Sequence, residues 1–155
     1  MPVVTLEELD TFAAGVRASG RTIALANGVF DLLHVGHVRY LQASAAEADC
    51  LIVAVNADAS VRRLKGDGRP IVDERGRAEM VAALRGVDRV VIFEDDTVGP
   101  LLQRLRPDVH CKGTDYTVDS VPERAVVKGY GGRTAIVGDA KQHATRELLQ
   151  RIAGS

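Results

Sequence analysis

Two histidines three residues apart are the first candidates for chemistry in this chain. The stretch "GVFDLLHVGHVRYL" (28–41) places His34 and His37 with Gly36 between them, where a hydrophobic strand is expected to give way to a helix. The N–H groups and positive dipole end of a helix N-terminus attract anions. Residues three apart share a helix face, so both imidazoles are expected to face that site, and Gly36 lets a phosphate approach the backbone. The spacing therefore predicts a phosphate cradle.

Two other interpretations of this histidine pair stay open at this point. Zinc needs three or four protein ligands, and the remaining histidines are His110, inside an apolar run, and His143. The pair can also be an ordinary helix start without a special role. The two common phosphate loops do not apply, because the sequence has no GxxxxGK[ST] and no GxGxxG after a strand.

Composition limits the class of protein. The 155 residues are 46% hydrophobic and 26% charged, which is typical of one soluble globular domain spanning 1–155. We expect an N-terminal helix within 1–20 and a catalytic core over 22–152. The net charge of −1 argues against nucleic acid or an anionic membrane as a partner.

Cysteine usage and the N-terminus indicate the compartment. Cys50 and Cys111 show neither a metal spacing nor a CxxC redox motif, so we expect buried, reduced thiols. The first residues, "MPVVTLEELD", lack a basic segment followed by an apolar core, and no apolar run approaches the roughly 20 residues that span a bilayer. A cytoplasmic protein is expected.

Short apolar runs alternate with helical periodicities along the whole chain. Thr5 and Glu8 predict a capping box at the start of an opening helix. The later alternation predicts a doubly wound, five-stranded parallel sheet of the Rossmann-like α/β class with this extra N-terminal helix. In such sheets ligands bind beyond the carboxyl ends of the strands. The five predicted strands are 22–26, 51–55, 89–93, 108–112 and 133–137.

The stretch "NGVFDLLHVGH" resembles the GxFDxxHxGH signature of the cytidylyltransferase-like nucleotidyltransferases. The resemblance continues through "LIVAVNADASVRRLKGDGRPI" (51–71), "RAEMVAALRGVD" (77–88) and "RPDVHCKGTDY" (106–116), and so covers most of 22–152. Within this family the chain looks most like the stand-alone adenylyltransferases that make ADP-heptose from D-glycero-β-D-manno-heptose 1-phosphate. The resemblance implies the HxGH type of nucleotidyltransferase fold, and a homodimer as the expected assembly.

The implied reaction is attack of a sugar phosphate oxygen on the α-phosphorus of ATP, with release of pyrophosphate. A sugar phosphate, with a second pKa of about 6, is already largely ionised at neutral pH, so no strong general base is required. Catalysis is expected to come from positioning and from neutralising phosphate charge. Mg²⁺ is expected to be carried mainly by the triphosphate, with no dedicated protein metal site.

The resemblance also implies roles for individual residues. His34, His37 and Lys65 are the expected catalytic residues. Asp31 either organises its loop or caps the helix, and Arg77 contacts substrate or forms a surface salt bridge. The expected nucleotide-binding residues are Asn27, Gly28, Val29, Phe30, Asp31, Gly36, Asn56, Lys112, Gly113, Asp115 and Thr145, and the expected substrate-binding residues are Asp58, Arg63, Arg77 and Arg146.

The segment "GDAKQHATRELL" departs from the family pattern, which has a serine- and threonine-rich turn here. Ala144 stands where a serine is usual, which puts one phosphate contact in doubt. Thr145 keeps one hydroxyl, and Arg146 or Lys141 can replace the missing contact. Two alternative functions are left open: a CTP-dependent cytidylyltransferase acting on glycerol or ribitol phosphate, and a non-catalytic nucleotide-binding protein.

Overall fold

A five-stranded parallel sheet forms the centre of the protein in a computed structural model, which describes residues 2–139 and 145–154. The strands lie in the order β3-β2-β1-β4-β5, and every neighbouring pair is parallel. Their bounds are β1 Ile23–Gly28, β2 Cys50–Asn56, β3 Arg89–Phe93, β4 Val109–Lys112 and β5 Arg133–Ile136. The predicted strands and the predicted fold class are confirmed.

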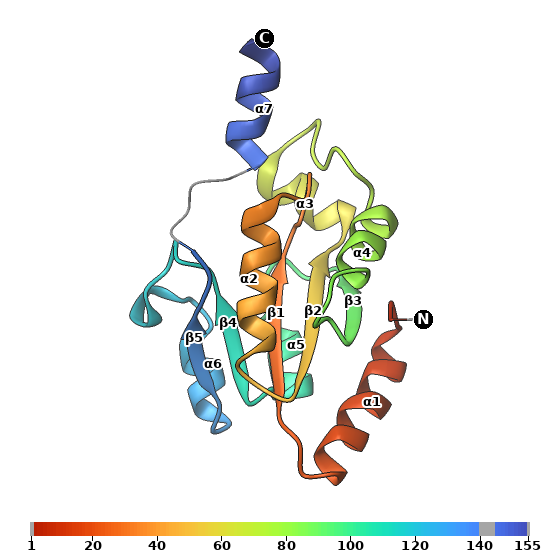
Figure 1. Ribbon diagram of the computed structural model, residues 1–155, viewed down its shortest axis with the longest axis vertical. Coiled ribbons are helices and arrows are strands. Elements are labelled where there is room, and N and C mark those ends of the chain that lie inside the picture. The colour runs from red at the N-terminus through yellow and green to blue at the C-terminus, as the bar shows by residue number, and fades with distance from the viewer. Residues whose placement is uncertain (1, 140–144, 155) are drawn as a thin grey trace.

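Helices cover both faces of this sheet. α1, α5 and α6 supply the buried apolar side chains of one core, and α2 and α4 supply those of the other. Figure 1 shows α2 in front of the sheet and α5 behind it. The helices are α1 Leu6–Ala18, α2 Val35–Ala45, α3 Asp58–Lys65, α4 Glu74–Ala82, α5 Gly99–Leu105, α6 Arg124–Gly129 and α7 Thr145–Gly154, with a short 3₁₀ helix at Val118–Ser120.

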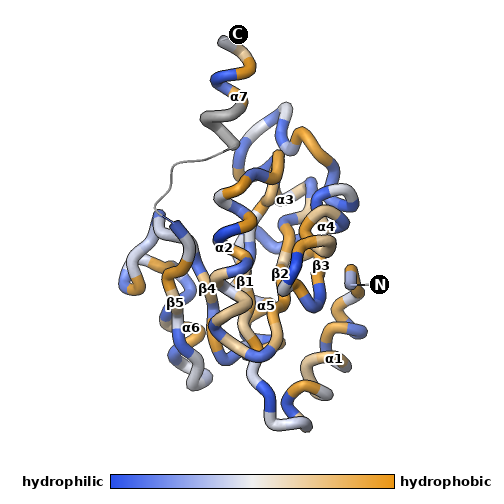
Figure 2. Tube along the Cα trace, viewed as in Figure 1, coloured by the Kyte–Doolittle hydropathy of each residue, from blue (hydrophilic) through white to orange (hydrophobic). Residues whose placement is uncertain are grey.

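Local sequence explains why these elements form where they do. The middle strand residues are apolar and buried on both faces of the sheet. Along the trace in Figure 2, hydrophobic colours dominate the strands, whereas hydrophobic and hydrophilic colours alternate along the helices. The predicted capping box is present, since Glu8 N–H donates to Thr5 Oγ1 at 3.2 Å and Thr5 N–H donates to Glu8 Oε1 at 3.1 Å. Both cysteines are buried and unpaired, and burial raises the pKa of Cys111 to about 11.

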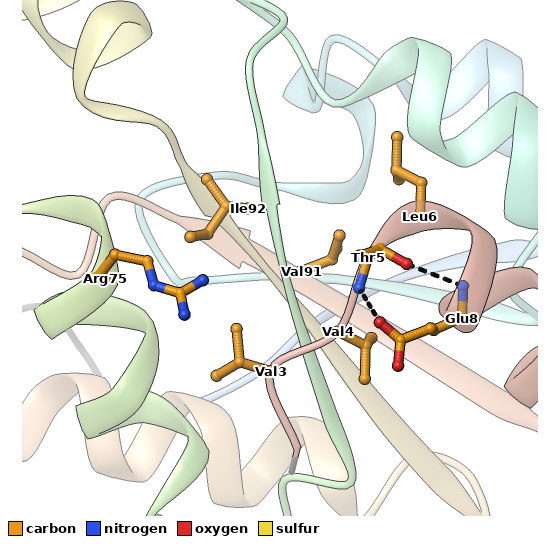
Figure 3. Close-up of a pocket in the computed structure, with 8 residues that line it drawn as sticks. All are labelled: Val3, Val4, Thr5, Leu6, Glu8, Arg75, Val91 and Ile92. Carbon is orange, nitrogen blue, oxygen red and sulfur yellow. Dashed lines mark hydrogen bonds between the residues drawn. The ribbon is translucent and has the colours of Figure 1, made fainter.

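The N-terminal segment covers the edge strand β3. Val4 N–H donates to Val90 O at 2.9 Å, and Val90 N–H donates to Pro2 O at 2.8 Å. This pairing satisfies backbone groups that an exposed edge would leave open. A hollow of about 340 Å³ lies beside it, with the Arg75 side chain across from the N-terminal segment (Figure 3). It is lined by Val3, Val4, Thr5, Leu6, Glu8, Arg75, Val91 and Ile92.

The strand order fixes where a ligand site belongs. The chain passes from β1 to β2 and β3 on one side, and β4 and β5 lie on the other side of β1. The direction of winding therefore reverses between β1 and β4, and the crevice beyond the carboxyl ends of these strands is the expected ligand site. Each helix in the described parts of the chain is too short or too polar to cross a lipid bilayer.

Candidate active site

The histidine pair lies directly beyond β1, at the start of α2. His34 is the N-cap residue, with extended backbone angles of φ −135° and ψ 175°. Its Nδ1 accepts a hydrogen bond from Gly36 N–H at 3.1 Å, and His37 Nδ1 accepts from His34 N–H at 3.2 Å. The two rings stack with their centroids 3.8 Å apart and their planes 22° apart. The two rings lie side by side, as expected. In addition, both rings accept backbone hydrogen bonds that cap the start of α2.

This capping decides which ring nitrogen can donate to a ligand. Because Nδ1 of each ring accepts a backbone N–H, a neutral imidazole carries its proton on Nε2. His34 and His37 therefore each present an Nε2–H donor. Gly36 N–H donates to His34, so this backbone donor is engaged at the helix start. The expectation that Gly36 leaves room for a phosphate stays a prediction.

Aromatic packing holds the pair against the sheet. The ring of Phe30 meets the His37 ring edge to face at 5.4 Å and stacks on Tyr40 at 6.4 Å. A Cβ on Gly28 would lie 3.1 Å from the Phe30 ring, so glycine leaves the room that this ring occupies. Tyr40 Oη donates to Cys111 O at 2.6 Å and so ties α2 to β4 across the point where the winding reverses.

Asp31 organises the loop 69–72 rather than capping α2. Its side chain is 1% exposed and accepts hydrogen bonds from Ile71 N–H at 2.9 Å, Val72 N–H at 3.0 Å and Arg69 Nε at 3.1 Å. Burial alone would raise the pKa of Asp31, but these donors outweigh it and hold the pKa below its usual value. The flanking Phe30 and Leu32 have φ of 54° and 48°, in the left-handed region that side chains rarely adopt.

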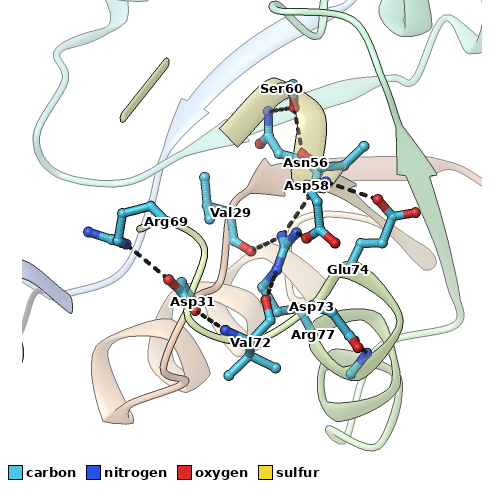
Figure 4. Close-up of polar contacts among 12 residues, drawn as sticks. Val29, Asp31, Asn56, Asp58, Ser60, Arg69, Val72, Asp73, Glu74 and Arg77 are labelled. Carbon is cyan, nitrogen blue, oxygen red and sulfur yellow. Dashed lines mark hydrogen bonds and ion pairs between the residues drawn. The ribbon is translucent and has the colours of Figure 1, made fainter. Parts of the chain in front are cut away.

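Arg77 is fully buried beneath the loops that follow β1 and β2 (Figure 4). Its Nη1 donates to Val29 O and to Asn56 O, both at 2.7 Å. Its Nε donates to Val72 O at 2.8 Å, and its Nη2 donates to Asp58 Oδ1 at 2.7 Å. A surface salt bridge is therefore wrong, and a side chain that is 0% exposed has no surface for a substrate.

The segment after β4 places a lysine at the crevice. Lys112 Nζ lies 4.9 Å from the centre of the Tyr116 ring, in a cation–π arrangement. Burial lowers the pKa of Lys112, and the carboxylates of Glu123 and Asp115 oppose that shift. A Cβ on Gly113 would meet no atom within 4 Å, so the chain here borders open space. Lys112 is therefore a partly dehydrated cation beside an open crevice.

Comparison with known proteins agrees with this geometry. The model of the cytidylyltransferase-like family matches residues 25–152. The chain belongs to this family. It is also 44% identical over 150 residues to the bifunctional protein HldE of Geobacter sulfurreducens, covering 97% of this chain and 31% of that protein. HldE of Nitrobacter hamburgensis is 45% identical over 148 residues, covering 96% and 30%. The chain thus spans about a third of the curated relatives that it matches.

Two solved structures share the architecture. The lipopolysaccharide core biosynthesis protein from Thermoplasma volcanium has a TM-score of 0.68 at 29% identity, over 79% of this chain and all of that one. Pantoate-beta-alanine ligase from Francisella tularensis has a TM-score of 0.72 at 13% identity, over 96% of this chain and 73% of that one. The second likeness concerns the fold alone.

Other residues expected at this family's site have structural partners. Asn56 is 6% exposed, and its side-chain amide donates to Ser60 Oγ at 3.4 Å. The Asp58 carboxylate accepts from Arg77. Arg63 pairs with Asp96 at 2.8 Å and so contacts the loop after β3. Each of these three side chains thus contacts another part of the protein, while Lys65 ends α3 on the exposed surface.

The segment after β5 is only partly described. α7 begins at Thr145, and Figure 1 places this helix beyond the carboxyl end of the sheet. The side chains of Thr145 and Arg146 lie outside the described residues, as do Lys141, His143 and Ala144 in full. The expected phosphate contacts of this segment therefore stay predictions.

Three residues near the site were not expected from the sequence. Arg69 pairs with Asp31, and Tyr40 bonds to β4. Arg39 pairs with Asp139 at 2.7 Å and links α2 to the segment after β5. Tyr40 had a detectable signal, because it lies three residues after His37 on the same helix face. The partners of the two arginines are more than thirty residues away, and no local pattern indicates them.

Replacing Arg77 with lysine is expected to destabilise the protein by about 3 kcal/mol, because one ammonium group cannot reproduce four buried contacts in a planar fork. Arg75→Lys, two residues earlier on α4 and exposed, is the matched control and should change stability by less than about 0.5 kcal/mol. Urea denaturation measures both. Equal midpoints for the two variants would contradict the bracing role.

Asp31→Asn is expected to cost about 2–3 kcal/mol at pH 7, because an amide replaces a buried carboxylate that accepts three hydrogen bonds. The folded-state pKa of Asp31 lies below its unfolded value, so its contribution is present above about pH 4 and is lost as pH falls further. The stability difference between native protein and variant should therefore shrink below pH 4. A pH-independent difference in urea denaturation would refute this account.

Proposed function

We propose that this protein transfers AMP from ATP to a sugar 1-phosphate, giving an ADP-sugar and pyrophosphate. The observation that carries the proposal is the stacked His34–His37 pair, whose Nδ1 atoms cap α2. Their Nε2–H groups are proposed to donate to phosphate. Membership of the cytidylyltransferase-like family supports the same reaction class. We expect Lys112, at the end of β4, and Lys65, at the end of α3, to supply further positive charge for the phosphates.

The reaction needs charge neutralisation more than proton removal. An oxygen of the sugar phosphate attacks the α-phosphorus and forms a new P–O bond. The bond from the α-phosphorus to the oxygen bridging it to the β-phosphate breaks, and pyrophosphate leaves with that electron pair. Two imidazole N–H donors held in one orientation stabilise the charge that develops, without reorganising during the step. A dianionic sugar phosphate is already the nucleophile at neutral pH.

The sugar is proposed to be D-glycero-β-D-manno-heptose 1-phosphate. The motifs after β1, β2 and β4 resemble the ADP-heptose branch of the family, and three relatives at 44–45% identity are HldE proteins. The CTP-dependent alternative and the non-catalytic alternative gain no comparable support. Because the chain spans about a third of these relatives, the proposal concerns this nucleotidyltransferase unit.

Mg²⁺ is proposed to enter with the nucleotide and to neutralise phosphate charge. In the described parts of the chain, no three His, Cys, Asp or Glu side chains are grouped so that they could hold a metal ion. The side chains described therefore do not form a cage, whereas Mg²⁺ commonly keeps waters and substrate phosphates as its ligands. A homodimer is proposed as the assembly.

Pyrophosphate release from ATP, Mg²⁺ and the heptose 1-phosphate is the direct test of the reaction. We expect turnover with ATP, and with CTP a kcat/KM at least about 100-fold lower, because hydrogen bonds to the exocyclic groups of a base discriminate strongly. Hexose 1-phosphates serve as substrate controls. Faster turnover with CTP and glycerol phosphate would replace this proposal with the cytidylyltransferase alternative, and silence with every pair would leave the non-catalytic one.

Two substitutions at His37 separate helix capping from catalysis. In His37→Asn the amide oxygen lies where Nδ1 was, so the cap is kept while the Nε2–H donor is lost. We expect kcat to fall by about 10²–10³ with little change in stability. His37→Gln instead returns an N–H near the Nε2 position and weakens the cap, so it should lose about 1 kcal/mol of stability but retain more activity. Equal kcat values for the two variants would contradict a donor role.

A further inference from the structure

Another histidine, outside the HxGH pair, contacts the side-chain amide of an asparagine near the carboxyl end of β1. His110, in β4, is 0% exposed, and its Nε2 lies 2.8 Å from Oδ1 of Asn27, the next-to-last residue of β1. Burial lowers the pKa of His110 to about 3, so the ring is neutral and carries a single N–H. The hydrogen bond to a carboxamide oxygen requires that proton on Nε2.

The opposite arrangement of this contact is costlier. If Asn27 were turned so that its amide N–H donated to Nε2, the ring proton would lie on Nδ1. His110 Nδ1 is buried and has no partner among the described residues, so that N–H donor would be unsatisfied. Buried unsatisfied N–H donors are rarer in proteins than unsatisfied acceptors. The His110 ring therefore favours the orientation of the Asn27 carboxamide in which Oδ1 faces β4.

The sheet register then determines where the amide N–H groups of Asn27 point. Leu25 is the registered partner of His110, so Asn27 lies two residues nearer the carboxyl edge than the level of the histidine. Because Oδ1 faces His110, Nδ2, on the other branch of the carboxamide, faces away from the histidine. Lys112, whose side chain shares a sheet face with that of His110, ends β4 at the same edge.

We propose that His110 is a positioning residue that fixes the Asn27 carboxamide with its NH₂ group facing the nucleotide, where it donates to an acceptor oxygen or ring nitrogen. This inference rests on the proposed function, since it names how that same crevice recognises ATP. Without the histidine, the amide can rotate and present its oxygen, which repels an acceptor. The buried ring thus acts on the nucleotide only through Asn27.

A double-mutant cycle on ATP binding tests this coupling. His110→Leu removes the donor at similar volume, and Asn27→Ala removes the amide. Each single variant is expected to weaken ATP binding by about 5- to 10-fold, the effect of one lost hydrogen bond. The double variant should bind no more weakly than Asn27→Ala alone, because the histidine has no other route to the ligand. Calorimetric titration with ATP measures the dissociation constants.

His110→Gln provides the rescue, because its side-chain N–H can again donate to Asn27 Oδ1, and it should bind ATP more tightly than His110→Leu. Thermal denaturation checks that each variant is folded, and His110→Met gives the same test if the leucine variant is not. Additive losses in the double variant, or identical losses for leucine and glutamine, would overturn the inference alone. Failure of the native chain to bind ATP would overturn it together with the proposed function.

Discussion

The buried guanidinium of Arg77 is the contact on which the rest of the site depends. It joins the carbonyl oxygens of Val29, just after β1, and Asn56, at the end of β2, to the loop at Val72 and to the Asp58 carboxylate. Removing such a charge from water costs several kcal/mol, which these four contacts must offset. The backbone that leads into the histidine pair is held by this network and by Asp31, so we expect a change in either one to displace the two histidines without touching them.

The two histidines interact directly with the backbone N–H groups at the start of α2. A helix N-terminus carries partial positive charge on N–H groups that point along its axis. Here two of those groups donate to imidazole nitrogens, and the same rings carry donors on their far sides. Under the proposed function, these ring donors take the place of backbone N–H groups as the contacts to phosphate.

The strands and the start of α2 could be predicted because their signals are local. Continuous apolar runs identify buried strands, and HxGH after the first of them indicates a helix start. The roles of Arg77 and Asp31 could not be predicted in the same way. Their partners are mostly backbone atoms of other segments, such as Val29 O and Ile71 N–H. Every residue has the same backbone carbonyl, and nearly every residue has the same N–H, so the sequence does not indicate which residue is the partner. A buried arginine therefore resembles a surface one in sequence.

The contact of His110 with Asn27 could not be predicted from the sequence either. In sequence it is a polar residue inside an apolar strand, and only the register between β1 and β4 places it beside Asn27. Strand order is a property of the whole fold, because the pairing partner of β4 is chosen by the crossovers that precede it. The sequence therefore shows that a histidine at this position is unusual, but it does not indicate that Asn27 is its partner.

The reciprocal locking of two loops has a consequence for how sequences of this family can be recombined. Asp31 holds the backbone of 71–72, while Arg77 reaches back to the carbonyl of Val29, so each segment fixes the other. Phe30 and Leu32, whose φ angles lie in the left-handed region, flank Asp31 in the first of these segments. Segments 29–32 and 69–77 therefore form a single unit of exchange, and a chimaera that takes one from a relative must take both.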